Sequence, residues 1–167
     1  MLGWLLGNPV VAADNPPFTF AAPTFFGKPA ISHNLLGTNY VYVARARAAH
    51  TLLMISTMAQ TTIRSQLGQL SEAQCVSLFQ REIGNTHARF FAVSDPAPLA
   101  VGAGRFPQVR WTAHKDHHME TGVLACGELD GRYYVVHFAD ELKSAITSFP
   151  FIRAALHALR SAPEQPQ

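Results

Sequence analysis

Residues Thr121 to Phe138, with the sequence TGVLACGELDGRYYVVHF, contain two apolar segments joined by Asp130 and Gly131. An Asp-Gly pair between alternating apolar residues predicts a β-hairpin, because a two-residue turn needs positive φ angles that Gly adopts freely. Such a turn also fixes the antiparallel register on either side of it. It places Leu129 opposite Arg132, and the remaining pairs follow in step.

Both faces of this hairpin are mainly apolar away from the turn. The predicted pairs are Leu129 with Arg132, Gly127 with Tyr134, Ala125 with Val136 and Val123 with Phe138 on one face, and Glu128 with Tyr133, Cys126 with Val135 and Leu124 with His137 on the other. A sheet that is apolar on both sides must be covered on both sides. We therefore expect an α+β protein with a mostly antiparallel sheet flanked by helices on both faces, an α/β/α sandwich.

Ser71 begins the clearest helix in the chain. It is a good N-cap, and Gln74 stands at the third position that a capping box requires. Apolar residues follow at helical spacing, and Gly84 with Asn85 is expected to end the helix.

A second helix is expected from Glu141 to about Arg160, with Asp140 as its cap. Pro150 lies inside this segment, so a kink or a break into two helices is expected there. The predicted apolar stripe consists of Ala145, Ile146, Phe149, Ile152, Leu156 and Leu159.

The other strands are less clearly marked. They are expected at Asn39–Val43, Thr51–Ser56, Arg89–Ser94 and Val109–Lys115. The second of these is also compatible with helix, since periodicity cannot separate the two for so short an apolar segment; we expect a strand after a turn near residues 46–49. Asp95 to Pro98 is expected to end the third strand, and residues 102–107 are expected to form a loop. Residues 15–29 are expected to be extended, with their phenylalanines packed against the body.

The composition favours one folded domain. Apolar residues make up 48% of the 167-residue chain and charged residues only 14%, which argues against disorder. We expect a single domain over residues 14–161 and a disordered, Pro-rich tail over 162–167. The net charge of +2 is small and the basic residues are scattered, so nucleic-acid binding is excluded.

The first residues resemble the end of a secretory signal. An apolar stretch is followed by Pro9 and then by small residues, so cleavage after Ala12 or Ala13 is expected and residues 1–13 would be a signal-peptide remnant. The stretch is short and no Lys or Arg precedes it, and the alternative is a segment that packs on the domain. The signal predicts a periplasmic or secreted protein. No segment has the roughly 20 apolar residues of a transmembrane span.

Cys75 and Cys126 are the only cysteines. They could pair in an exported protein, since such proteins meet an oxidising environment. Two buried thiols that serve as small apolar residues are the favoured interpretation.

Residues 113–120, AHKDHHME, concentrate histidines and carboxylates between two predicted strands. An extended backbone would place alternate side chains of this segment on one side. Imidazole and carboxylate groups bind zinc or copper, so the segment is a candidate metal site. Its candidate ligands are His114, Asp116, His117, His118 and Glu120. The alternative is that these polar residues gather there because a connection between strands is solvated.

No residue is assigned a catalytic role. His137 shares a hairpin face with Cys126, but the surroundings are apolar and no third group orients the pair, so a packed core histidine is favoured. Gly102 to Arg105 lacks the Lys-Ser/Thr of a phosphate-binding loop and is expected to be a flexible linker. Neither G-x-S-x-G nor H-E-x-x-H occurs.

The order of predicted elements, ending in a helix after the strand Tyr133 to Phe138, resembles the PsbP-like α/β/α sandwich group; a profilin- or longin-like layout would fit equally. The resemblance covers about Phe18 to Arg160 and implies a non-enzymatic accessory or binding protein. We therefore expect an exported binding module with an unknown protein or small-molecule partner and no cofactor. The alternatives are a metal-binding protein that uses residues 114–120 with zinc or copper, and a small hydrolase, which the absent nucleophile motif disfavours.

Overall fold

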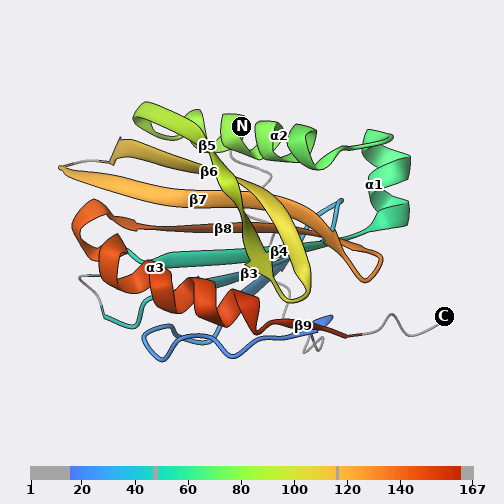
Figure 1. Cartoon of the computed structure of the whole chain (residues 1–167), viewed down its shortest axis with the longest axis horizontal. Helices are drawn as coiled ribbons and strands as arrows, with labels where there is room; N and C mark the ends of the chain where they lie inside the picture. Colours follow the sequence, from blue (N-terminus) through green and yellow to red (C-terminus); the bar gives the residue numbers. More distant parts are fainter. Residues whose placement is uncertain (1–15, 47–48, 116, 163–167) are drawn as a thin grey trace.

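The computed structural model describes residues 16–46, 49–115 and 117–162, and an antiparallel sheet runs through its centre (Figure 1). The seven strands of this sheet are, in spatial order, β2 (Ala30–His33), β3 (Thr38–Val43), β4 (Leu52–Ala59), β8 (Arg132–Glu141), β7 (His118–Leu129), β6 (Gly104–Lys115) and β5 (Ala88–Val101). The three helices in the described chain are α1 (Gln60–Leu67), α2 (Glu72–Gly84) and α3 (Leu142–His157). The predicted α+β class and mostly antiparallel sheet are confirmed.

The hairpin of β7 and β8 has the register that its turn predicts. All seven predicted pairs form, from Leu129 opposite Arg132 to Val123 opposite Phe138. Asp130 has a φ of 50° and Gly131 a φ of 76°, as a turn that follows the twist of the two strands requires. The strands predicted at 39–43, 51–56 and 109–115 also form, as β3, β4 and part of β6.

Alternate residues of β7 point into two separate cores. Ala125 packs in a core with α3 and the N-terminal segment, whereas Cys126 packs in a core with α1 and α2. Helices α1 and α2 pack on one face of the sheet, whereas α3 shares the other face with residues 18–26. The expected α/β/α sandwich is therefore confirmed only in part. Within that segment Phe18 and Phe26 are buried, as predicted.

The two ends of the described chain meet in a short second sheet. Its strands are β1 (Phe18–Thr19) and β9 (Arg160–Ser161). The amide of Ala162 donates to the carbonyl of Pro17 over 2.8 Å. The predicted signal remnant, residues 1–13, and all of the predicted tail beyond Ala162 lie outside the described residues.

The capping box of α2 is confirmed. Ser71 Oγ accepts from the amide of Gln74, whose side chain accepts in return from the amide of Ser71. Helix α1 was not predicted, and its N-cap position Ala59 offers no side-chain hydrogen bond. It is held instead by tertiary packing, with Ile63 buried in the core beneath α2.

Helix α3 differs from its prediction at three points. Glu141, not Asp140, occupies the N-cap position, because the carboxylate of Asp140 accepts hydrogen bonds from side chains elsewhere. The helix runs past Pro150 without a break: Pro150 and Ile146 are both exposed, so water can reach the Ile146 carbonyl that Pro150 leaves without a donor. The predicted apolar stripe is wrong at Ile146, which is 82% exposed.

Strands β5 and β6 form a longer hairpin than predicted. The expected loop over residues 102–107 is wrong, since Leu99 pairs with Phe106 and only Gly102 and Ala103 form the turn. The register shifts between Asp95 and Leu99, and this irregularity accommodates the two prolines that suggested a strand end.

Cys75 of α2 and Cys126 of β7 form a disulfide with a Cα–Cα distance of 6.1 Å. The expectation of two buried thiols is therefore wrong. The capped helix packs over β7, and both cysteines are fully buried in the core between them. The bridge closes a long loop that includes all of β5 and β6.

Removing this bridge should weaken the fold measurably. The two cysteines are 51 residues apart, and a loop of that length corresponds to about 4 kcal/mol of entropy lost by the unfolded chain. Replacing both cysteines with Ala should lower the free energy of unfolding in urea by about 2–4 kcal/mol. A reductant should produce a similar loss in the natural protein and none in the double variant. Equal stability of the two proteins without reductant would contradict the structure.

Candidate functional site

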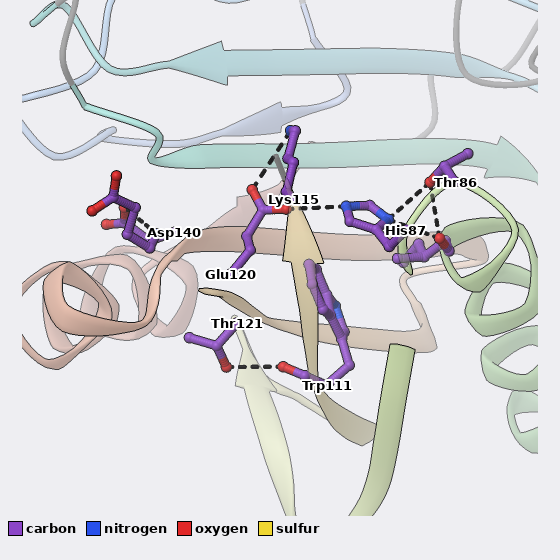
Figure 2. Close-up of polar contacts among 9 residues, drawn as sticks. Thr86, His87, Trp111, Lys115, Glu120, Thr121 and Asp140 are labelled. Atoms are coloured by element: carbon purple, nitrogen blue, oxygen red, sulfur yellow. Dashed lines mark hydrogen bonds and ion pairs between the residues drawn. The ribbon is translucent and has the colours of Figure 1, made fainter. Parts of the chain in front are cut away.

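Polar side chains gather at the end of the sheet where β7 begins and β8 ends (Figure 2). Here Glu120 and Glu141 are directly opposite each other on the two strands. Two carboxylates in this position repel each other, so each needs a cation nearby. Each obtains one lysine and one histidine, and the histidines come from other parts of the chain.

Glu120 is the buried member of this pair, with 4% of its surface exposed. One carboxylate oxygen lies 3.0 Å from Nε2 of His87, and the other lies 3.7 Å from Nζ of Lys115 (Figure 2). Nδ1 of His87 lies 2.8 Å from the carbonyl oxygen of Ile83 at the end of α2. Both ring nitrogens of His87 therefore face oxygen atoms, Nδ1 the Ile83 carbonyl and Nε2 the Glu120 carboxylate, and these two contacts fix the orientation of the ring.

Glu141 is held by groups closer to solvent. Its Oε1 lies 3.2 Å from Nε2 of His50, and its Oε2 lies 2.9 Å from Nζ of Lys143. The hydrogen bond from Lys143 is the main reason why the pKa of Glu141 is lowered, with further contributions from the charges of Lys143, His50 and His118. The same hydrogen bond raises the pKa of Lys143. Glu141 is therefore a carboxylate at neutral pH.

The predicted metal-binding residues do not act as one set. Strand β6 ends at Lys115 and β7 begins at His118, and these two residues are paired. The chain therefore reverses direction between them, so His114 pairs with Met119 and lies on the face opposite to His118. The sequence prediction placed these residues in the connection between two strands and reasoned that an extended backbone would put alternate side chains on one side.

Within the described residues, one group of three potential metal-ligating side chains, two imidazoles and one carboxylate, converges. It consists of His50, His118 and Glu141, whose ligand atoms all lie within 4.8 Å of one another. His118 is thus the one predicted metal residue in the group. Glu120 is engaged with His87, His117 is exposed, and Asp116 lies outside the described residues.

Sequence reasoning missed Glu141, although the signal was present. Extending the register of the Asp-Gly turn to the far end of the hairpin places residue 141 opposite Glu120. His50 could not be found in this way, because its position depends on the pairing of β4 with β8, two strands far apart in the sequence.

His137 and Trp111 lie between this polar group and the core of α2. His137 is fully enclosed, and burial, followed by the charges of His87 and Lys115, lowers its pKa to about 4. Its ring centroid is 5.7 Å from that of Trp111, which occupies space left by Gly122, where a Cβ atom would overlap the indole. The predicted packed core histidine is confirmed, and the disulfide of Cys126 leaves no thiolate for it to activate.

A cavity of about 390 Å³ lies on the other face, beside the first half of α3. Its floor includes Asp140, which is 2% exposed and accepts hydrogen bonds from Thr51 Oγ1 at 2.8 Å and Ser148 Oγ at 2.6 Å. The rings of Phe25 and Phe151 line its walls. The cavity thus combines apolar walls with a buried carboxylate, a combination typical of small-molecule sites. The sequence had indicated Asp140 only as a helix cap.

No protein-family model and no curated protein matches the chain. Among solved structures, the fold is similar to that of LpqN from Mycobacterium tuberculosis, a protein described as involved in cell envelope biogenesis. The TM-score is 0.55 at 12% sequence identity, and the alignment covers 87% of this chain and 83% of LpqN. At this identity the similarity shows the fold alone. The resemblance to the PsbP-like group is not tested by it and stays a prediction.

None of the helices in the described part of the chain has both the length and the apolar character that crossing a bilayer requires.

The low pKa of His137 should make stability depend on pH. His137 stays neutral in the fold down to a pKa of about 4, whereas its ordinary pKa is 6.5. The unfolded chain therefore binds more protons between these values, so stability is complete above about pH 6.5 and falls as the pH drops toward 4. The full shift corresponds to about 3 kcal/mol. Urea unfolding at about pH 7.5 and about pH 4.5 measures the loss.

Two variants assign that loss to His137. His137→Met cannot titrate and should lose about 2 kcal/mol less than the natural protein over the same pH interval. His157→Gln, at an exposed position on α3, should retain the full pH dependence. An equal loss in His137→Met and the natural protein would show that His137 is not the buried neutral group.

Proposed function

We propose that this protein is an exported, non-enzymatic accessory module of the cell envelope that binds a small molecule in the cavity beside α3. The observation that carries the proposal is the cavity itself, with its aromatic walls and its buried Asp140. Both oxygens of Asp140 already accept hydrogen bonds, from Thr51, Ser148 and the amide of Glu141, so a ligand donor would share a carboxylate that the fold holds in place. Binding modules are commonly built in this way, with a few polar groups that orient an otherwise apolar ligand.

The lining indicates the chemistry of the ligand. Phe25 and Phe151 favour an apolar body, because they offer aromatic surface. Asp140 accepts hydrogen bonds and carries no ion pair with a lysine or arginine in the described chain, so it favours a hydroxyl or amine group at the inner end. The ligand that fits is therefore a small amphipathic molecule with a hydrogen-bond donor at one end.

Three observations support a periplasmic or secreted location. Disulfides form and persist mainly in oxidising compartments, and Cys75 and Cys126 are paired. The first residues have the pattern of a secretory signal. LpqN, which has a similar fold, is described as involved in cell envelope biogenesis, and this is an analogy at the level of the fold.

We also propose that the fold is an α/β/α sandwich in which one covering layer consists of α3 together with residues 18–26. Helix α3 and the phenylalanines of residues 18–26 pack in the same core, so together they act as one layer. The cavity lies between these two parts of the layer, since Phe25 and Phe151 both line it.

Filling the cavity should abolish binding of a small amphipathic probe. The probe is the fluorescent dye anilinonaphthalene sulfonate, titrated against the folded protein. Thr147 lines the cavity, so Thr147→Trp should weaken dye binding by about tenfold or more. The matched control is Ile146→Trp, which adds an indole at the neighbouring exposed position that does not line the cavity, and it should leave dye binding unchanged. Equal effects of the two substitutions would remove the cavity as the binding site.

The location is tested separately in cells of the source organism. Fractionation with an antibody to the protein should find it in the envelope or the medium. Alkylation under denaturing conditions without reductant should then leave both cysteines unmodified, because they are paired. Detection in the cytosolic fraction with reactive thiols would contradict export.

A further inference from the structure

Three potential metal ligands converge at the polar end of the sheet, and they come from separate parts of the chain. His50 precedes β4, His118 is the first residue of β7, and Glu141 is the last residue of β8. Their ligand atoms lie within 4.8 Å of one another, and none of them belongs to the cavity beside α3.

One of these separations fits a common metal ion. Nε2 of His50 and Oε1 of Glu141 are 3.2 Å apart. Two ligands of one tetrahedral zinc ion, each about 2.0–2.1 Å from the metal, stand roughly 3.3 Å apart. The ring of His118 completes the group, since its centroid lies 4.5 Å from that of His50.

His118 supplies an independent observation. Its Nε2 atom is shielded from solvent and has no hydrogen-bond partner within the described residues. Leaving a polar atom shielded and without a partner costs free energy, so such atoms in a folded protein call for an explanation. An ion pair between His50 and Glu141 gives this imidazole no partner, whereas a metal ion shared by the three side chains would engage a ring nitrogen of His118.

We propose that His50, His118 and Glu141 form a binding site for a zinc ion. Two imidazoles and one carboxylate are a ligand set that zinc accepts, and the fourth position is open to water or to a ligand atom.

The charged groups around the site are compatible with a divalent cation. Lys143 contacts Oε2 of Glu141 over 2.9 Å and leaves Oε1 facing His50, so the carboxylate can bind a metal through one oxygen. Glu120, opposite Glu141, adds a second carboxylate. One of its oxygens contacts His87 and the other contacts Lys115. Two carboxylates and two lysines therefore meet at the sheet end, and a cation bound at Glu141 would further offset the repulsion between the carboxylates.

Calorimetric titration of the metal-free, disulfide-bonded protein with zinc chloride at about pH 7.5 tests the proposal. One zinc ion should bind per chain. His50→Gln and His118→Gln should each weaken binding by about tenfold or more, since each removes one of three ligands. Cobalt(II), used as a spectroscopic probe, should show the visible absorption of a four-coordinate ion in the natural protein and lose it in both variants.

The matched controls come from the same hairpin. His114→Gln and His117→Gln remove histidines that are not part of the group and should bind zinc with affinity within about twofold of the natural protein. Glu141→Gln provides a third ligand variant, to be used if a histidine variant unfolds at a lower urea concentration than the natural protein. The proposal is overturned if zinc does not bind stoichiometrically, if the His50 and His118 variants bind as well as the natural protein, or if the control variants lose binding equally.

Discussion

The pairing of β7 with β8 is the constraint on which the other features of the structure depend. The turn at Asp130 and Gly131 allows one antiparallel register, and a slip of a single residue would send every side chain to the opposite face. This register directs Ala125 into the core of α3 and Cys126 toward α2, where it forms the disulfide. The division of β7 side chains between the two cores, and the position of Cys126 in its disulfide with α2, are therefore set by one short turn.

The same register places two carboxylates opposite each other at the far end of the hairpin. The polar cluster around them offsets their repulsion. Because Glu120 and Glu141 are opposite each other, the fold needs cations at this position. The side chains that contact these carboxylates come from separate segments. His87 follows α2 and His50 precedes β4, and the two lysines come from the end of β6 and the start of α3. The histidines thus lie beside carboxylates as a consequence of strand pairing. The end of the sheet therefore carries side chains of the types that bind metal ions.

Sequence reasoning succeeded where structure is decided locally and failed where it is decided by distant pairing. The hairpin turn and the Ser71 capping box were predictable, because each depends on residues within a few positions. The arrangement of residues 114–120 was not predictable locally, because the chain reverses between Lys115 and His118, and the pairing of β4 with β8 that places His50 near Glu141 leaves no local pattern. The disulfide likewise depends on where α2 crosses the sheet.

The cavity and the polar cluster are neighbours because Asp140 and Glu141 are consecutive residues of one strand. Successive side chains of a strand point to opposite faces, so Asp140 faces the cavity and Glu141 faces the histidines. Lys143 belongs to both sites, since it lines the cavity and pairs with Glu141. A cation bound at Glu141, as proposed above, would compete with Lys143 for that carboxylate. Because Lys143 contacts both proposed sites, we expect occupancy of one to change the interaction free energy at the other, and such a coupling would be reciprocal.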